Sequence, residues 1–140
     1  MSTLCTKCNK QTTIGFTLLE LLVVIVIVGI LTAIAYPSYL AWILKSHRSD
    51  AMATLSQDQA ILERCYAQTF AYNQACPALP TFPQTSPQGY YIITLTNQSG
   101  TTYTLTATTT GMQVADTLCP SMSIDQANNK TALTTSCWTP

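Results

Sequence analysis

One acidic side chain, Glu20, stands at the start of the longest apolar segment of this 140-residue chain. No charged residue follows it between Leu21 and Leu44. A charge at the centre of a bilayer costs roughly 2.5–3.5 kcal/mol on insertion scales, so a carboxylate in such a segment indicates a function. The chemistry open to it is ion pairing, since a carboxylate and an ammonium about 4 Å apart attract by roughly 4 kcal/mol at an effective dielectric of 20.

A short basic and polar leader precedes this apolar segment. Residues 1–15 contain Lys7 and Lys10 and no acid, which is too polar for the apolar core of a secretory signal peptide. The Gly15-Phe16 junction then opens the apolar run. These residues resemble the class III processing site of type IV prepilins. The resemblance implies that a prepilin peptidase removes residues 1–15 and that Phe16 becomes an N-methylated N-terminus.

The same resemblance gives Glu20 a partner. In the pilin family, the glutamate at this position pairs with the N-terminal amine of a neighbouring subunit, so Glu20 and Phe16 are expected to set the register of a filament. The reference pKa of an α-amine is near 8, so this amine is largely charged at neutral pH. A local alternative stays open, because residues four apart share one helix face and Glu20 could pair with its own terminus.

The six cysteines fall into two groups. Cys5 and Cys8 form a lone C-x-x-C in the leader, where no second pair or histidine cluster completes a zinc site, so they are interpreted as incidental thiols. The other four lie beyond the apolar segment and favour two disulfides in an oxidising compartment. Of three possible connectivities, the local pairs are favoured: Cys65–Cys76 and Cys119–Cys137. No metal and no cofactor are expected.

Residues 16–44 are expected to form a helix that crosses a membrane. A bilayer core needs about 20 helical residues, and the uncharged run from Leu21 to Leu44 contains 24. Gly29 and Pro37 interrupt it, and in pilins the stretch between such positions can lose helicity inside the filament. The alternative is an ordinary proline kink in a membrane helix.

Residues 45–72 read as an amphipathic continuation, so that one helix extends from Phe16 to about Tyr66. Ala51, Leu55 and Leu62 recur at helical spacing. The acids fall outside this stripe and are expected on other helix faces: Asp50, Asp58 and Glu63. This half of the helix is expected to pack on a small sheet.

Residues 73–140 are expected to form that sheet. A proline-rich loop over 75–89 comes first. The β-rich runs 90–96 and 101–109 then predict a hairpin. Met122 and Ile124 suggest a third strand, and residues 131–138 either a fourth strand or a looped tail. The predicted class is α+β, the type IV pilin fold with a disulfide-closed C-terminal region, and the ending Ser136-Cys137-Trp138 resembles short PilE-type minor pilins.

Other classes of protein are poorly supported. No nucleophile–base set or phosphate-binding glycine loop can be assembled, so an enzyme is not expected. The one histidine, His47, lies between Lys45 and Arg48 and is expected to be solvated or to face lipid head groups. The net charge is zero, and Lys130 is the only cation after Arg64, so no nucleic-acid site is identifiable.

The expected function is a structural subunit, most simply a minor pilin, of a type IV pilus that serves adhesion, twitching motility or DNA uptake. Its expected partners are other pilin subunits, through the N-terminal helix, and the prepilin peptidase with its methyltransferase activity. It is expected to reside in the inner membrane as a single-pass protein and then in the extracellular pilus. The alternatives are a pseudopilin of a type II secretion system and an adhesive module on an uncleaved anchor.

Overall fold

A computed structural model of the chain describes residues 15–139. The chain divides into two compact units, Met1–Pro37 and Ser38–Pro140. One helix, α1, runs over Leu18–Thr69 and contributes to both. It is long and apolar enough to cross a membrane, as the sequence predicted. The leader residues Cys5, Cys8, Lys7 and Lys10 lie outside the described residues.

Helix α1 ends a few residues beyond the predicted end at Tyr66. Its last residue is Thr69, and the next, Phe70, adopts a left-handed conformation with φ of 57°. A residue in this conformation ends a helix, because the following carbonyl can no longer continue the ladder. The Thr69 hydroxyl donates to the carbonyl oxygens of Cys65 and Ala71, at 3.0 and 2.9 Å, which satisfies acceptors that the helix end leaves open.

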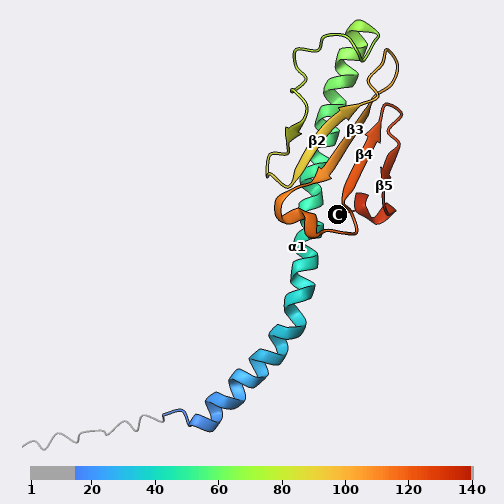
Figure 1. The fold of residues 1–140 in the computed structure, drawn as a ribbon. Helices are drawn as coiled ribbons and strands as arrows, with labels where there is room; N and C mark the ends of the chain where they lie inside the picture. Colours follow the sequence, from blue (N-terminus) through green and yellow to red (C-terminus); the bar gives the residue numbers. More distant parts are fainter. Residues whose placement is uncertain (1–14, 140) are drawn as a thin grey trace, which may run out of the picture. The chain divides into compact units, whose positions relative to one another are not determined.

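Five strands form one antiparallel sheet in the order β1-β2-β3-β4-β5. Figure 1 shows β2, β3 and β4 laid against the second half of α1. The three central strands carry most of the pairing, with Ile93 opposite Ala107 and Ala107 opposite Met122. The strands are β1 Gln84–Thr85, β2 Tyr91–Thr96, β3 Thr104–Thr109, β4 Ser121–Asp125 and β5 Lys130–Ala132.

The hydrophobic core lies between α1 and the inner face of this sheet. Strand residues alternate between the two faces, so Tyr91 and Ile93 are fully buried while Ile92 between them is exposed. A fully buried side chain of this size contributes about 1.5–3 kcal/mol. The core residues from the helix and the two other central strands are Ala51, Leu55, Leu62, Leu105, Ala107, Met122 and Ile124.

The structure adds two elements that the sequence pattern did not reveal, β1 and η1. The proline-rich segment contains the two-residue strand β1, paired with β2. The 3₁₀ helix η1, Gly111–Ala115, fills the connection between β3 and β4. The C-terminal region contains both expected alternatives in turn, since β5 is followed by the 3₁₀ helix η2, Thr135–Trp138.

Two disulfides close the unit Ser38–Pro140. Cys65 near the end of α1 is joined to Cys76 in the loop that follows, and Cys119 before β4 is joined to Cys137 in η2. Both sulfurs of the second bridge lie in the core, where Cys119 and Cys137 are fully buried. The second bridge therefore fastens the last residues of the chain to the start of β4.

Candidate functional site

The processing and assembly residues lie at the start of α1. Gly15 and Phe16 precede the helix, and the side chains of Phe16 and Glu20 are exposed. Glu20 is the acid of the first helical turn. A carboxylate there interacts favourably with the positive end of the helix dipole. Within residues 15–139, the Glu20 carboxylate accepts no side-chain hydrogen bond.

Thr17 fixes where this helix begins, and the sequence interpretation missed it. Its Oγ1 accepts the backbone N–H of Glu20 at 3.2 Å, and its carbonyl accepts the N–H of Leu21 at 3.1 Å. Thr17-Leu18-Leu19-Glu20 matches the capping-box spacing, a threonine followed three residues later by a glutamate. That signal places the helix start at Leu18 and leaves Phe16 outside it, so the four-residue helical spacing of Phe16 and Glu20 is not present here.

Residues Gly29 to Pro37 are helical in the structure. Thr32 donates from its hydroxyl to the carbonyl of Val28 at 2.7 Å, which gives this polar side chain a partner inside an apolar segment. Melting of this stretch in a filament is not tested by the isolated chain and stays a proposal.

A buried ion pair joins α1 to the connection between β3 and β4. Arg48 Nε donates to Asp116 Oδ2 at 2.7 Å, and a second guanidinium nitrogen donates to Oδ1 at 2.9 Å. Both side chains are buried. The hydrogen bonds from Arg48 to Asp116 raise the pKa of the guanidinium further. The bidentate geometry makes this a specific clamp between segments 68 residues apart.

Gln113 of η1 extends the ion pair into a network. Its fully buried amide nitrogen donates to the Leu44 carbonyl at 2.9 Å and to Tyr91 Oη at 3.1 Å. His47 Nδ1 lies 2.9 Å from Gln113 Oε1, and its ring stacks on Tyr90 with centroids 3.6 Å apart. Of the two alternatives for His47, the freely solvated one was therefore wrong, because η1 and Tyr90, just before β2, cover the half-buried ring.

Asp50, Asp58 and Glu63 were expected on helix faces other than the apolar stripe, and none of the three is exposed in the structure. Glu63 accepts hydrogen bonds from the hydroxyls of Tyr72 and Tyr103, each at 3.0 Å. Burial, followed by the hydrogen bond to Glu63, raises the pKa of Tyr72 to about 12. Asp50 and Asp58 are buried as well. Gln84 donates to Asp58 and the backbone N–H of Gln88 donates to Asp50, whereas Asp50 Oδ2 has no hydrogen-bond partner among the described residues. Helical periodicity does not reveal these contacts with distant segments.

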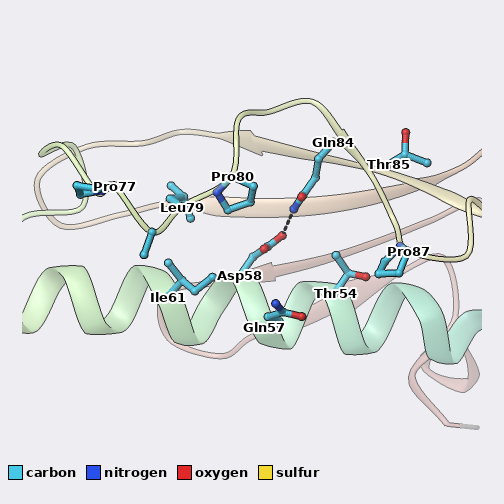
Figure 2. Close-up of a pocket in the computed structure, with 11 residues that line it drawn as sticks. Thr54, Gln57, Asp58, Ile61, Pro77, Leu79, Pro80, Gln84, Thr85 and Pro87 are labelled. Carbon is cyan, nitrogen blue, oxygen red and sulfur yellow. Dashed lines mark hydrogen bonds between the residues drawn. The ribbon is translucent and has the colours of Figure 1, made fainter.

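A cavity of about 440 Å³ lies between α1 and the proline-rich loop. Figure 2 shows Asp58 pointing from the helix toward Gln84 of β1, whose amide donates to the Asp58 carboxylate. Burial raises the pKa of Asp58 to about 6. Pro77, Pro80 and Pro87 form part of the opposite wall. The loop is thus held to the helix by the contact between Gln84 and Asp58 and by the backbone N–H of Gln88, which donates to Asp50 at 3.4 Å, beside the Cys65–Cys76 bridge.

Residues 15–139 contain no group of three or more His, Cys, Asp or Glu side chains that could hold a metal ion. One basic and one aromatic side chain meet on the surface of β5 and η2, where Lys130 Nζ lies 5.3 Å from the centre of the Trp138 ring. The sequence interpretation did not connect these two residues.

Two family models match the chain. The model described as type IV minor pilin ComP, DNA uptake sequence receptor, matches residues 37–123, which is more than half of the chain. The prokaryotic N-terminal methylation motif matches residues 14–36. Together the two matches cover the apolar segment, the amphipathic half of α1 and the sheet through most of β4.

Curated relatives match part of the chain. The chain is 45% identical over 51 residues to the type IV major fimbrial protein FimA of Dichelobacter nodosus, which is 36% of this chain and 33% of FimA. It is 31% identical over 86 residues to the type IV major pilin protein PilE1 of Neisseria gonorrhoeae, which is 61% of this chain and 40% of PilE1. The chain therefore matches about a third to two fifths of the length of these relatives.

Solved structures extend the likeness to the sheet. A type IV pilin from Shewanella oneidensis has a TM-score of 0.53 at 26% identity, covering 69% of this chain and 99% of that one. The Neisseria meningitidis non-core minor pilin PilV shares the fold, with a TM-score of 0.52 at 18% identity, covering 64% of this chain and 86% of that one. Sequence motif, family model and fold agree, and the chain belongs to the type IV pilin family.

Proposed function

We propose that this chain is a structural subunit, and specifically a minor one, of a type IV pilus rather than an enzyme. It is held in the inner membrane by residues 16–44 before assembly and becomes part of the extracellular filament afterwards. The family models and the pilin fold support this proposal. Through the filament, the subunit supports adhesion, twitching motility or DNA uptake.

Processing prepares the subunit for assembly. A prepilin peptidase cuts between Gly15 and Phe16, and the associated methyltransferase activity modifies the new amine of Phe16. Cutting removes residues 1–15 with Lys7 and Lys10 and creates a cation at the start of the apolar segment. In an apolar medium that amine and a carboxylate of an adjacent subunit attract by several kcal/mol.

Glu20 is the observation that carries the proposal. It is exposed in the first turn of α1, and within the described residues its carboxylate accepts no side-chain hydrogen bond. The exposed position leaves it open to the amine of a neighbour. Pairing between subunits fixes their axial register. If one subunit slides along the axis relative to its neighbour, the amine and the carboxylate separate and two charges are left unpaired in an apolar core.

The test compares Glu20→Gln with Leu18→Ala, a truncation in the same turn that keeps the charge. Both variants are expected to be cleaved normally, as measured by mass spectrometry of the mature N-terminus. Only Glu20→Gln is expected to be depleted from sheared pili, by tenfold or more. Normal incorporation of Glu20→Gln would remove the charge-pair mechanism, and an intact Met1 in membranes would remove the pilin function itself.

Pseudopilin and adhesive-anchor functions are separated from this proposal by one deletion. Loss of the gene is expected to reduce piliation or pilus-dependent behaviour and to leave protein secretion unchanged. The opposite result, normal pili with arrested secretion, assigns the chain to a type II secretion system. An uncleaved N-terminus with normal pili and normal secretion assigns it to an adhesive anchor.

DNA uptake is a second candidate function, because the matching family model is described as a DNA uptake sequence receptor. The pairing of Lys130 with Trp138 supports it, since a cation can neutralise a phosphate and an indole can stack on a base. A single phosphate contact predicts weak binding with a salt slope near −1. Binding of duplex DNA by the chain in detergent, lost in Lys130→Gln and kept in Arg64→Gln, would support this function.

A further inference from the structure

The connection between β3 and β4 presents exposed apolar side chains at one end of the unit Ser38–Pro140. Met112 is 86% exposed, Val114 58% and Leu118 63%. The opposite end of the sheet, at the turn 97–103, is formed by Asn, Gln, Ser, Gly, Thr and Tyr residues instead. Exposed apolar groups gathered on one connection indicate a contact with an apolar partner. We call Met112, Val114 and Leu118 the η1 patch.

Hydrogen bonds fix the height of the η1 patch along α1. Gln113, between two patch residues, donates to the carbonyl of Leu44. His47 and Arg48, one turn further, bind Gln113 and Asp116. The patch therefore lies beside the helix at the residue where the uncharged run Leu21–Leu44 ends.

The length of the uncharged run places the η1 patch at the level of a membrane surface. The 24 residues of the uncharged run span about 36 Å of helix, whereas the hydrocarbon core of a bilayer is about 30 Å thick. The last turn of the run therefore reaches the interfacial layer. Trp42, which is exposed, and Lys45, directly after the run, are the residue types that occupy this layer.

The surroundings of the patch also suit lipid. An apolar cavity of about 260 Å³ lies between the helix and η1, lined by Leu40, Ile43, Leu44, His47, Met112 and Ala115. The one acid of residues 111–118, Asp116, is buried and neutralised by Arg48. Gly111, with φ of 56°, turns the chain so that η1 starts at this edge. The patch therefore presents apolar groups and no free negative charge to anionic head groups.

We propose that the η1 patch is a second membrane contact, which dips into the interfacial layer of the outer leaflet of the membrane that holds α1. Its partner is the lipid surface, because η1 lies beside Leu44, the last residue of the uncharged run, and the patch presents no free negative charge. The contact rests on the membrane-anchored stage of the proposed function. It holds the folded unit against the membrane before the subunit leaves for the filament.

Methionine methyl groups provide the reporters for the test. The full chain, labelled with ¹³C at its methionine methyls, is placed in nanodiscs of phosphatidylethanolamine and phosphatidylglycerol at one copy per disc. Met112 reports on the patch, while the fully buried Met122 and the half-buried Met52 of α1 serve as references. Leu31→Met, a volume-conserving change, adds a reporter inside the membrane segment.

A doxyl-labelled lipid is expected to broaden the Met112 methyl at least threefold more than Met52 and Met122, and a soluble gadolinium chelate is expected to spare it. In Val114→Asp, the chelate is expected to broaden the Met112 methyl signal, and the doxyl-labelled lipid is expected to spare it. Thr101→Asp, an exposed position in the β2–β3 turn, introduces the same charge and is expected to leave the wild-type pattern unchanged.

The outcomes separate the contact from the anchoring on which it rests. One outcome overturns the membrane contact alone. In it, the doxyl-labelled lipid broadens the methyl signal introduced by Leu31→Met but not that of Met112, and the gadolinium chelate broadens the Met112 signal instead. If the doxyl-labelled lipid does not broaden the methyl signal introduced by Leu31→Met, the membrane anchor itself is contradicted. Protection of Met112 that arises only with several copies per disc assigns the patch to contact between copies of the chain and also overturns the proposal.

Discussion

The buried ion pair between Arg48 and Asp116 should control the stability of the folded unit, and Asp116→Asn tests it. The substitution keeps the shape of the side chain and removes its charge. The two oxygens of Asp116 accept from Arg48 at 2.7 and 2.9 Å, and the side chains are 7% and 3% exposed. An asparagine offers one oxygen and turns an NH₂ group toward a guanidinium that can only donate.

The loss of stability depends on the groups that are left without a partner after the substitution. Removing one member of a buried pair leaves the other charge without a partner and costs about 3–5 kcal/mol. Gln113 loses an acceptor as well, because its amide also contacts Asp116 Oδ2 at 3.3 Å. We therefore expect Asp116→Asn to lower the free energy of unfolding by about 3 kcal/mol, a change of roughly two powers of ten in the folding equilibrium.

Pulse proteolysis of the full chain in detergent, across a urea series, measures this free energy. The double variant Arg48→Met with Asp116→Leu is expected to recover most of the loss, since apolar groups of similar volume often replace a buried pair without cost. Thr101→Asn, on the surface, is the control. A single variant within about 0.5 kcal/mol of the wild type, or a double variant as unstable as the single one, would refute the reasoning.

Three further predictions concern the same unit. Because burial raises the pKa of Asp58 from 3.8 to about 6, the folded state holds its proton at a higher pH than the unfolded state. The stabilisation that this proton gives is complete below pH 4 and is lost between pH 4 and 6, by about 2–3 kcal/mol. In Asp58→Asn, the free energy of unfolding measured in urea should not show that loss as the pH is raised. Replacing Cys119 and Cys137 together by serine should cost about 3 kcal/mol and shorten survival under protease, without changing N-terminal cleavage. Glu63→Gln should lower the pKa of Tyr72, measured by ultraviolet titration, because the charged acceptor that disfavours the phenolate is removed.

Local patterns in the sequence predicted the elements that depend on local physics. Residues 16–44 predicted a membrane helix because their uncharged run is long enough to cross a bilayer. The β-branched and aromatic residues of 90–96 and the alternation in 101–109 predicted the hairpin of β2 and β3. The strand at Met122 and Ile124 followed from the same alternation. The start of α1 was also available in the sequence, since Thr17 is a helix-capping residue type whose hydroxyl accepts the backbone N–H of Glu20, a signal that the periodicity analysis did not use.

Contacts between distant segments were not available in this way. Arg48 and Asp116 are 68 residues apart, and Gln113 is 69 residues from Leu44. Nothing in the local pattern marks Gln113 as fully buried, since an isolated glutamine in a polar stretch is usually exposed. The burial of Asp58 was not predicted for a related reason. It lies off the apolar stripe of the helix, and the proline-rich loop, which contains Gln84, folds over it.

The distribution of acids gives Glu20 its significance. Five of the six acids accept intramolecular hydrogen bonds: Asp50, Asp58, Glu63, Asp116 and Asp125. Each of them therefore has a partner inside the unit Ser38–Pro140. Within the described residues, the carboxylate of Glu20 makes no such bond, and it stands in the segment where an unpaired charge costs most. A charge kept there without an internal partner is explained by an external one, and the amine created at Phe16 is the cation that processing places nearest to it.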